Sequence, residues 1–215
     1  MADTRARALI TAATGRRAAL ETAMRDTAGD LVWGTRIAGD PLPDTPHREA
    51  LGPHAEIFDL FVEAASADAV AAVLAPLAPL VDPARSAVIA GPYHLLMPWQ
   101  GPYLMIFALR PRVGMSRADF LDYWTTKHGP LIVAAGRGKG SYYQLHAHPG
   151  ATTTLARTLG YVIDDLAGNA GGWLKEPEKL ARFFHHPSTL AALADERMFI
   201  DHRRSPLNIY RIESA

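Results

Sequence analysis

The sequence contains no cysteine, and that absence excludes several kinds of chemistry together. Disulfide bonds, thiolate nucleophiles and cysteine-based zinc sites all need this residue. A charge excess of one sign is also missing, since Lys plus Arg and Asp plus Glu number 22 each. Such a chain has no cationic field to attract nucleic acid or an anionic membrane, so we expect neither partner.

Long apolar runs are missing too. No stretch approaches the roughly 20 residues that a membrane-spanning helix needs. The N-terminal segment MADTRARALITAATGRR has only a short apolar run followed by two arginines, which is not typical of a signal peptide. Hydrophobic residues make up 48% of the 215 residues, which is enough for one large domain or two small ones. We therefore expect a soluble, cytoplasmic protein.

The second half of the chain shows a clear series of elements. The apolar run Tyr103–Leu109, bounded by Gly-Pro and Arg-Pro, predicts a buried strand. Ser116 with Asp119 three residues later forms a loose capping box, so a helix should begin there. Gly129-Pro130 should break or kink that helix, and 141–148 should form a strand rich in aromatics.

The remaining segments complete one order of elements twice. In the second half we expect a third strand at 167–174, an interrupted helical region at 177–199, a fourth strand at 207–212 and an irregular or helical insert at 151–158. The first half shows the same order more faintly, with strands at 8–12, 31–38, 56–63 and 87–97, helices at 15–25 and 67–80, and a proline-rich loop at 40–53. This is the β-α-β-β-α-β order of ferredoxin-like folds.

The predicted fold class is therefore α+β, with two ferredoxin-like halves. We place the first half at 1–100 and the second at 101–215. A ferredoxin-like sheet has helices on one face only, so its other face needs a partner. We expect the two antiparallel sheets to pack together as one pseudo-twofold α+β barrel.

The segment LRPRVGMSRADFLDYWTTKHGPLIVAAGRGKGSYYQLHAH resembles the EthD family. The features that carry the resemblance are the capping Ser116, the F-x-x-Y-W pattern from Phe120, His128 with a proline two residues on, and the strand near 142–146. The run DERMFIDHRRSP resembles the segment before that family's last strand. The first half has no equivalent of His128 and looks like a degenerate repeat.

The resemblance implies a fold of the dimeric α+β barrel superfamily. Within this superfamily some members are cofactor-independent cyclases, dehydratases, monooxygenases or isomerases that act on phenolic or polyketide-like compounds, and some bind haem. The pocket of such proteins typically lies between helices and sheet. A shared fold indicates the position of a site better than its reaction.

His128 is the first candidate for catalysis. It follows an amphipathic helix and precedes Gly129-Pro130, and an imidazole can exchange a proton near neutral pH. The structural alternative is that it caps the carbonyl groups at the helix end. Asp195, near the C-terminus, is expected to form a surface or subunit-interface ion pair.

Tyr142 and His146 are the other catalytic candidates. Side chains alternate along a strand, so both should share one face with Gln144 and His148. A phenol and an imidazole on one pocket wall could polarise a carbonyl or relay a proton, although the same residues could form an exposed strand face. His148 is expected in solvent. A metal site is not expected, because no third ligand stands at a recognisable spacing.

Five further residues are candidates for substrate binding. Tyr123 and Trp124 belong to the EthD-like motif, Arg110 ends a strand where it could bind a carboxylate, and His94 and Trp99 stand near the end of the first half. Buried aromatics and strand-end arginines also occur without any such role.

Together these residues predict a cofactor-independent lyase, dehydratase, cyclase or isomerase. His128 would be its general acid/base, and Tyr142 or His146 would hold the oxygen on which charge develops. The expected partner is a small aromatic or polyketide-like molecule, and a homodimer is compatible with the sequence. Two alternatives stay open: a non-catalytic ligand-binding or assembly protein, and a haem protein whose axial histidine nothing in the sequence specifies.

Overall fold

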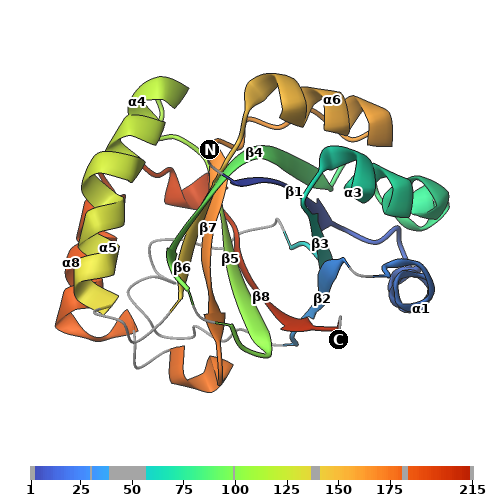
Figure 1. Cartoon of the computed structure of the whole chain (residues 1–215), viewed down its shortest axis with the longest axis horizontal. Coiled ribbons are helices and arrows are strands. Elements are labelled where there is room, and N and C mark those ends of the chain that lie inside the picture. Colours follow the sequence, from blue (N-terminus) through green and yellow to red (C-terminus); the bar gives the residue numbers. More distant parts are fainter. Residues whose placement is uncertain are drawn as a thin grey trace.

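The computed structural model describes residues 3–29, 31–38, 57–98, 100–136, 141–180 and 184–213. Within these ranges eight antiparallel strands close into a barrel with helices on its outside (Figure 1). The strands are β1 (Asp3–Ile10), β2 (Val32–Arg36), β3 (Leu60–Ala64), β4 (Ala87–Met97), β5 (Tyr103–Leu109), β6 (Tyr142–His146), β7 (Gly168–Leu174) and β8 (Leu207–Ile212).

The helices form two groups outside the barrel (Figure 1). One group consists of α1 (Arg17–Thr27), α3 (Ala67–Leu74) with the 3₁₀ turn η1 (Ala75–Leu80), and α6 (Pro149–Leu159). The other consists of α4 (Arg117–Tyr123), the π-helical turn η2 (Trp124–His128), α5 (Gly129–Gly136) and α8 (Pro187–Glu196). Two short 3₁₀ turns, η3 (Pro177–Lys179) and η4 (His202–Arg204), lie in the connections around α8.

Around the barrel the strands follow the order β1-β3-β2-β8-β5-β7-β6-β4. The first four strands meet the last four at two seams, where β2 pairs with β8 and β4 pairs with β6. The predicted antiparallel α+β barrel is therefore confirmed. The finer division into two ferredoxin-like halves stays a prediction.

Most of the predicted elements are confirmed. The strands at 87–97, 103–109 and 207–212 have the predicted bounds, and the glycine-rich segment near 167–174 forms β7. The insert at 151–158 is the helix α6. The prediction of a half-buried strand at 56–63 was wrong, because β3 begins at Leu60 and is buried on both faces, one by helices and one by the barrel interior. The predicted loop at 40–53 lies outside the described residues.

The helix that follows β5 begins as predicted. Ser116 caps α4 by accepting a hydrogen bond from the amide of Asp119 (3.1 Å). Gly129-Pro130 was predicted to break or kink the helix. The chain stays helical there, but the α-helical hydrogen-bond pattern is interrupted by η2, which ends directly before α5. In this wider turn the Gly129 amide donates to the carbonyl of Trp124, five residues back. Pro130, the second residue of α5, has no amide proton, so it leaves no hydrogen-bond donor unsatisfied at this position.

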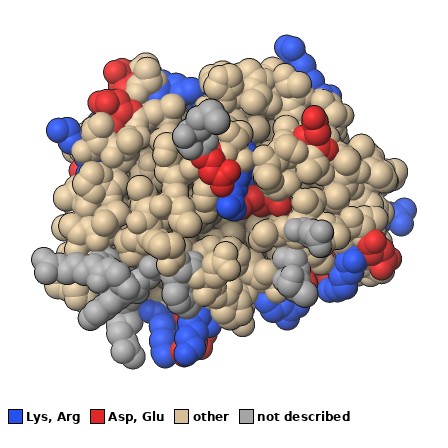
Figure 2. Space-filling view, in the orientation of Figure 1, with Lys and Arg blue, Asp and Glu red and all other residues tan. Residues whose placement is uncertain are grey.

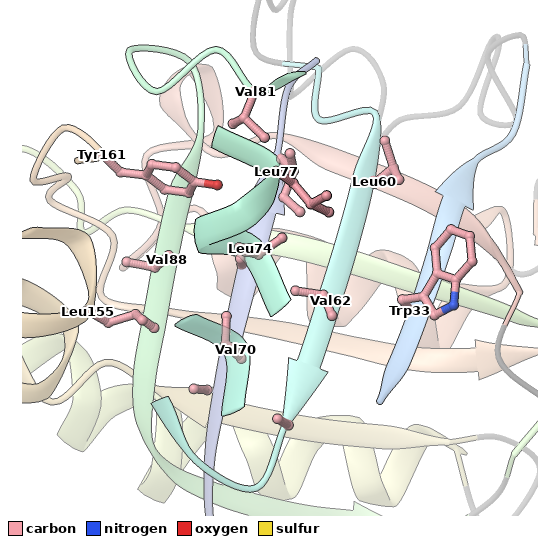
Figure 3. Close-up of a cluster of buried hydrophobic side chains, with 14 of the residues drawn as sticks. Trp33, Leu60, Val62, Val70, Leu74, Leu77, Val81, Val88, Leu155 and Tyr161 are labelled. Carbon is pink, nitrogen blue, oxygen red and sulfur yellow. The ribbon is translucent and has the colours of Figure 1, made fainter. Parts of the chain in front are cut away.

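The outer face of the first four strands is closely covered. Val70 and Leu74 of α3 and Leu77 of η1 lie against Val62 of β3 and Val88 of β4 (Figure 3). Each of these side chains is almost fully buried. Leu155 of α6 and Tyr161 extend the same apolar cluster (Figure 3). Among the described residues of this cluster, the helices fill the space above the sheet with their own side chains.

A polar group lies inside the barrel. Arg7 of β1 is 1% exposed and forms an ion pair with Glu63 of β3. The same guanidinium donates hydrogen bonds to the hydroxyl of Tyr143 on β6 and to Oδ1 of Asn169 on β7 (2.6 Å). Glu63 also binds Arg5. The ion pair joins two early strands, β1 and β3, and the hydrogen bonds from Arg7 to Tyr143 and Asn169 link them to the late strands β6 and β7.

Charged side chains stand in small groups of both signs on the face shown in Figure 2. Most of the centre of this face is uncharged apart from one mixed group. This face therefore shows no broad basic patch of the kind that binds nucleic acid. Within the described ranges, no helix combines the length and apolar character that crossing a bilayer requires.

The ion pair inside the barrel should dominate the response of the fold to charge removal. Glu63→Gln leaves the buried Arg7 charge uncompensated, so it should lower the free energy of unfolding by about 3–5 kcal/mol. Glu21→Gln is the matched control, because Glu21 pairs with Arg17 on the surface of α1 and should change stability by less than about 1 kcal/mol. Urea denaturation measures both. Equal effects of the two substitutions would contradict a structural role for the buried pair.

Candidate functional site

A cavity of about 580 Å³ lies between the α4–η2–α5 helix, α8 and the late strands of the barrel. This size is typical of sites for small molecules and cofactors. Its walls are mainly apolar and include Met105, Phe107, Phe184, Leu193 and Ile200. The polar groups that reach it are fewer: His128, Ser141, Tyr142, His186, Ser188, Thr189 and Glu196.

Small residues on β7 leave space for the aromatic side chains of Trp124 and Tyr143. Ala170 and Gly171 form part of the cavity wall. A Cβ atom on Gly171 would lie 2.4 Å from the hydroxyl oxygen of Tyr143, and one on Gly168 would lie 2.8 Å from the Trp124 ring. Both distances are too short for real atoms. The glycines therefore let Trp124 lie against the sheet from outside and Tyr143 fill the barrel from inside.

His128 ends the π-helical turn and is 3% exposed. Its Nδ1 lies 2.8 Å from Oδ2 of Asp195 on α8, at hydrogen-bonding distance. The other oxygen of this carboxylate accepts a hydrogen bond from the hydroxyl of Tyr123 (2.7 Å), which raises the pKa of that phenol. The His128 ring also packs on Phe199, with 5.0 Å between ring centroids. The imidazole is thus fixed by groups on both sides.

The second nitrogen of His128 faces a different carboxylate. Oε1 of Glu196 lies 3.9 Å from Nε2, which is beyond hydrogen-bonding distance. The other oxygen of Glu196 lies 3.0 Å from Nε2 of His202. Asp195 therefore orients the His128 ring through Nδ1, while Nε2 lies near an acidic group that also lines the cavity.

Tyr142, Gln144 and His146 share one face of β6, as predicted from strand alternation. Nε2 of His146 lies 3.0 Å from Oε1 of Gln144, whose amide nitrogen is 3.1 Å from the Tyr142 hydroxyl. Tyr142 reaches the cavity, whereas His146 is absent from its lining. Its ring lies against Trp124 instead, with 4.7 Å between centroids.

The other predicted site residues have different positions. Trp124 lines the cavity, whereas Tyr123 is absent from its lining and bonds to Asp195, the partner of His128. Arg110 is buried in ion pairs with Asp164 and Asp165, so it holds a connecting segment.

Two further candidates lie near the end of the first half. The centroid of the His94 ring lies 4.6 Å from that of the His146 ring, and the two rings are tilted relative to each other. His94 is not part of the cavity wall. Trp99 lies outside the described residues.

Two acidic residues were missed or misread from the sequence. Asp195 was expected in a surface or interface pair, but its side chain is 16% exposed and holds His128. Glu196 was not singled out at all. A usable signal existed for Glu196, because Thr189, Ala192, Leu193 and Glu196 repeat at the spacing of one helix face, and all four line the cavity. No local pattern connects Asp195 to a histidine 67 residues earlier.

Residues 112–203 match the family model of the EthD domain, which confirms the resemblance of this part of the chain to that family. A search of curated proteins gives no match. A mutant chlorite dismutase from Candidatus Nitrospira defluvii is similar in structure, with 8% identity, 98% of this chain and 92% of that chain covered, and a TM-score of 0.53.

Two further solved structures are similar along nearly the whole chain. A proposed monooxygenase from Fusobacterium nucleatum has 8% identity, covers 97% of this chain and 91% of its own, and has a TM-score of 0.50. A heme-binding protein from Thermus thermophilus has 12% identity, with 99% and 92% covered and a TM-score of 0.47. At such identities the likenesses with TM-scores of 0.53 and 0.50 establish only that the chains share a fold.

The comparisons correct the function expected from the sequence. A cofactor-independent lyase, dehydratase, cyclase or isomerase is contradicted, because the solved proteins that share this fold include chlorite dismutases. They agree better with the alternative of a haem-binding or ligand-binding protein.

The buried position of His146 should make the stability of the protein depend on pH. Burial, followed by the nearby His94, lowers the pKa of His146 to about 4 from 6.5. Between these values the unfolded chain takes up a proton that the folded protein does not, so stability should fall as the pH drops from 6.5 to 4 and level off below 4.

The comparison of wild type with His146→Gln isolates this effect. Urea denaturation at pH 7, 5.5 and 4.5 should show a steeper loss of stability for wild type than for the variant. His148→Gln removes an exposed histidine and should leave the wild-type profile unchanged. Parallel profiles for wild type and His146→Gln would contradict the lowered pKa.

Proposed function

We propose that this EthD-domain protein binds haem in the cavity between η2, α5, α8 and the barrel, where His128 would hold the iron. The observation that carries the proposal is the hydrogen bond between His128 Nδ1 and Asp195 at the edge of an apolar cavity. A histidine that ligates a metal usually donates its other ring N–H to a carboxylate in this way. Haem iron is commonly held by one such histidine.

The donor set of the site fits a metal-binding imidazole. An ionised carboxylate can only accept, so the contact with Asp195 keeps the proton on Nδ1. In the neutral ring the lone pair is then on Nε2, the nitrogen that iron would bind. Tyr123 fixes Asp195 through its second oxygen, so the ring orientation is set by a chain of two hydrogen bonds.

The cavity walls also fit a large apolar ring system. Met105, Phe107, Leu193 and Ile200 would contact it with apolar atoms and exclude water. Among the described residues that line the cavity there is no lysine or arginine. The carboxylates of haem would therefore be hydrogen-bonded by neutral groups or stay in water.

When bound, haem supplies redox and oxygen chemistry at its iron. The chain itself would hold His128 in one tautomer through Asp195 and keep the surroundings apolar. Glu196, near His128 Nε2 and paired with His202, would add a carboxylate that can hold a proton inside the cavity.

A second candidate is an uncharged apolar ligand that binds without iron. The predominance of apolar side chains and the lack of a basic residue among the described lining support it. In this case His128 and Asp195 would form a polar point that orients the ligand.

We further infer that the chain consists of two ferredoxin-like halves, 1–100 and 101–215, of which the second binds the ligand. The equivalent strand orders β4-β1-β3-β2 and β8-β5-β7-β6 support this division. The dense helix packing on the first four strands supports the assignment of the ligand to the second half.

Hemin titration tests the proposal. Wild type should develop a Soret band with one hemin per chain, and His128→Ala and His128→Gln should both lose that spectrum. Asp195→Asn should weaken hemin binding by about 10- to 100-fold, because it removes the acceptor that orients the ring. His148→Ala, at an exposed histidine outside the cavity, is the matched control and should bind as wild type does.

Iron-free protoporphyrin distinguishes the two candidates. If iron ligation drives binding, protoporphyrin should bind more weakly than hemin and equally to wild type and His128→Ala. Equal affinity of wild type for both porphyrins would favour the apolar-ligand candidate. Unchanged hemin spectra in both His128 variants would refute the role of His128 in holding the iron.

A further inference from the structure

Among the described residues, the hydroxyl group of Tyr142 has two hydrogen-bond partners. The side chain is 7% exposed and reaches the cavity. Two donors point to its oxygen: Nε1 of Trp124 at 3.0 Å and the amide nitrogen of Gln144 at 3.1 Å. The indole N–H can only donate. The direction of the hydrogen bond between Tyr142 and Gln144 depends on how the Gln144 amide is oriented.

The surroundings of Gln144 fix the orientation of its amide. Its nitrogen also lies 3.3 Å from the carbonyl oxygen of Trp124, and its oxygen lies 3.0 Å from His146 Nε2. A flipped amide would place its oxygen against the Trp124 carbonyl oxygen, where no proton is available. The Gln144 nitrogen therefore donates both of its protons, one to Trp124 and one to Tyr142.

The oxygen of Tyr142 thus accepts two hydrogen bonds, and neither neighbour can accept its proton. Burial raises the pKa of this phenol, so the proton is retained throughout the neutral range. A buried donor without a partner costs free energy, and such groups are commonly satisfied by a ligand. The hydroxyl of the adjacent Ser141, another cavity residue, is also buried without a partner among the described residues.

We infer that Tyr142 donates its phenolic proton to an oxygen of the bound ligand, and so selects ligands that carry a carbonyl or carboxylate group. Trp124 and Gln144 orient the hydroxyl by occupying its oxygen. The inference rests on the proposal that this cavity holds a ligand, but it does not need that ligand to contain iron. A carboxylate of haem and the carbonyl of an aryl ketone both meet its requirement.

A matched pair of small aromatic probes tests this inference without any porphyrin. 2-Acetylnaphthalene carries a carbonyl oxygen, and 2-isopropenylnaphthalene replaces that oxygen with a CH₂ group of similar shape. Calorimetric titration should show that wild type binds the ketone about three- to tenfold more tightly, as expected for one neutral hydrogen bond. Tyr142→Phe should bind both probes equally, with the affinity for the hydrocarbon unchanged.

Tyr161→Phe is the control variant. It makes the same chemical change in a buried tyrosine of the apolar cluster that covers the outer face of the first four strands (Figure 3). This variant should keep the wild-type preference for the ketone.

Four results would overturn the inference: no preference in wild type, a preference that survives in Tyr142→Phe, equal loss of both affinities in that variant, or no binding of either probe. A ketone preference that depends on Tyr142 in a protein that fails to bind hemin would reject the haem proposal alone.

Discussion

The ion pair of Arg7 with Glu63 inside the barrel is the contact on which the rest of the architecture depends. One guanidinium from β1 bonds to groups on β3, β6 and β7, so a single buried charge joins strands from the beginning and the end of the chain. Such a charge is tolerated only when its partners are in place. The barrel must therefore close in one register for Arg7 to be satisfied. Two of these strands, β6 and β7, also contribute residues to the wall of the ligand cavity.

The fold could be predicted largely from local patterns. Compact apolar runs such as Tyr103–Leu109 are strands with the expected bounds, and the capping residue Ser116 begins its helix as predicted. Patterns failed where tertiary contacts decide the outcome. β3 was expected to have one exposed face, but helices cover its outer face and its other face lies in the barrel interior. Gly129-Pro130 was expected to break or kink a helix, and the chain instead continues into α5 after a π-helical turn that ends directly before these residues.

The candidate site could be predicted only in part. The EthD motif identified His128, and strand alternation placed Tyr142 beside Gln144 correctly. The partner of His128 could not be found in this way, because Asp195 is brought to it by the packing of α8 against η2. The ion pairs of Arg110 could not be found for a similar reason, since Asp164 and Asp165 lie on a distant connection. Contacts between elements far apart in sequence leave no local signal.

The unequal covering of the two sides of the barrel has a consequence for how such a protein can change during evolution. Substitutions in the cavity wall, for example at Ala170 or Leu193, alter the space offered to a ligand while the tightly packed cluster around Val70 and Leu74 stays intact. Robustness and novelty are thus assigned to different parts of one polypeptide. A lineage can exchange one ligand for another without rebuilding the scaffold, which is how a single fold comes to host unrelated chemistries.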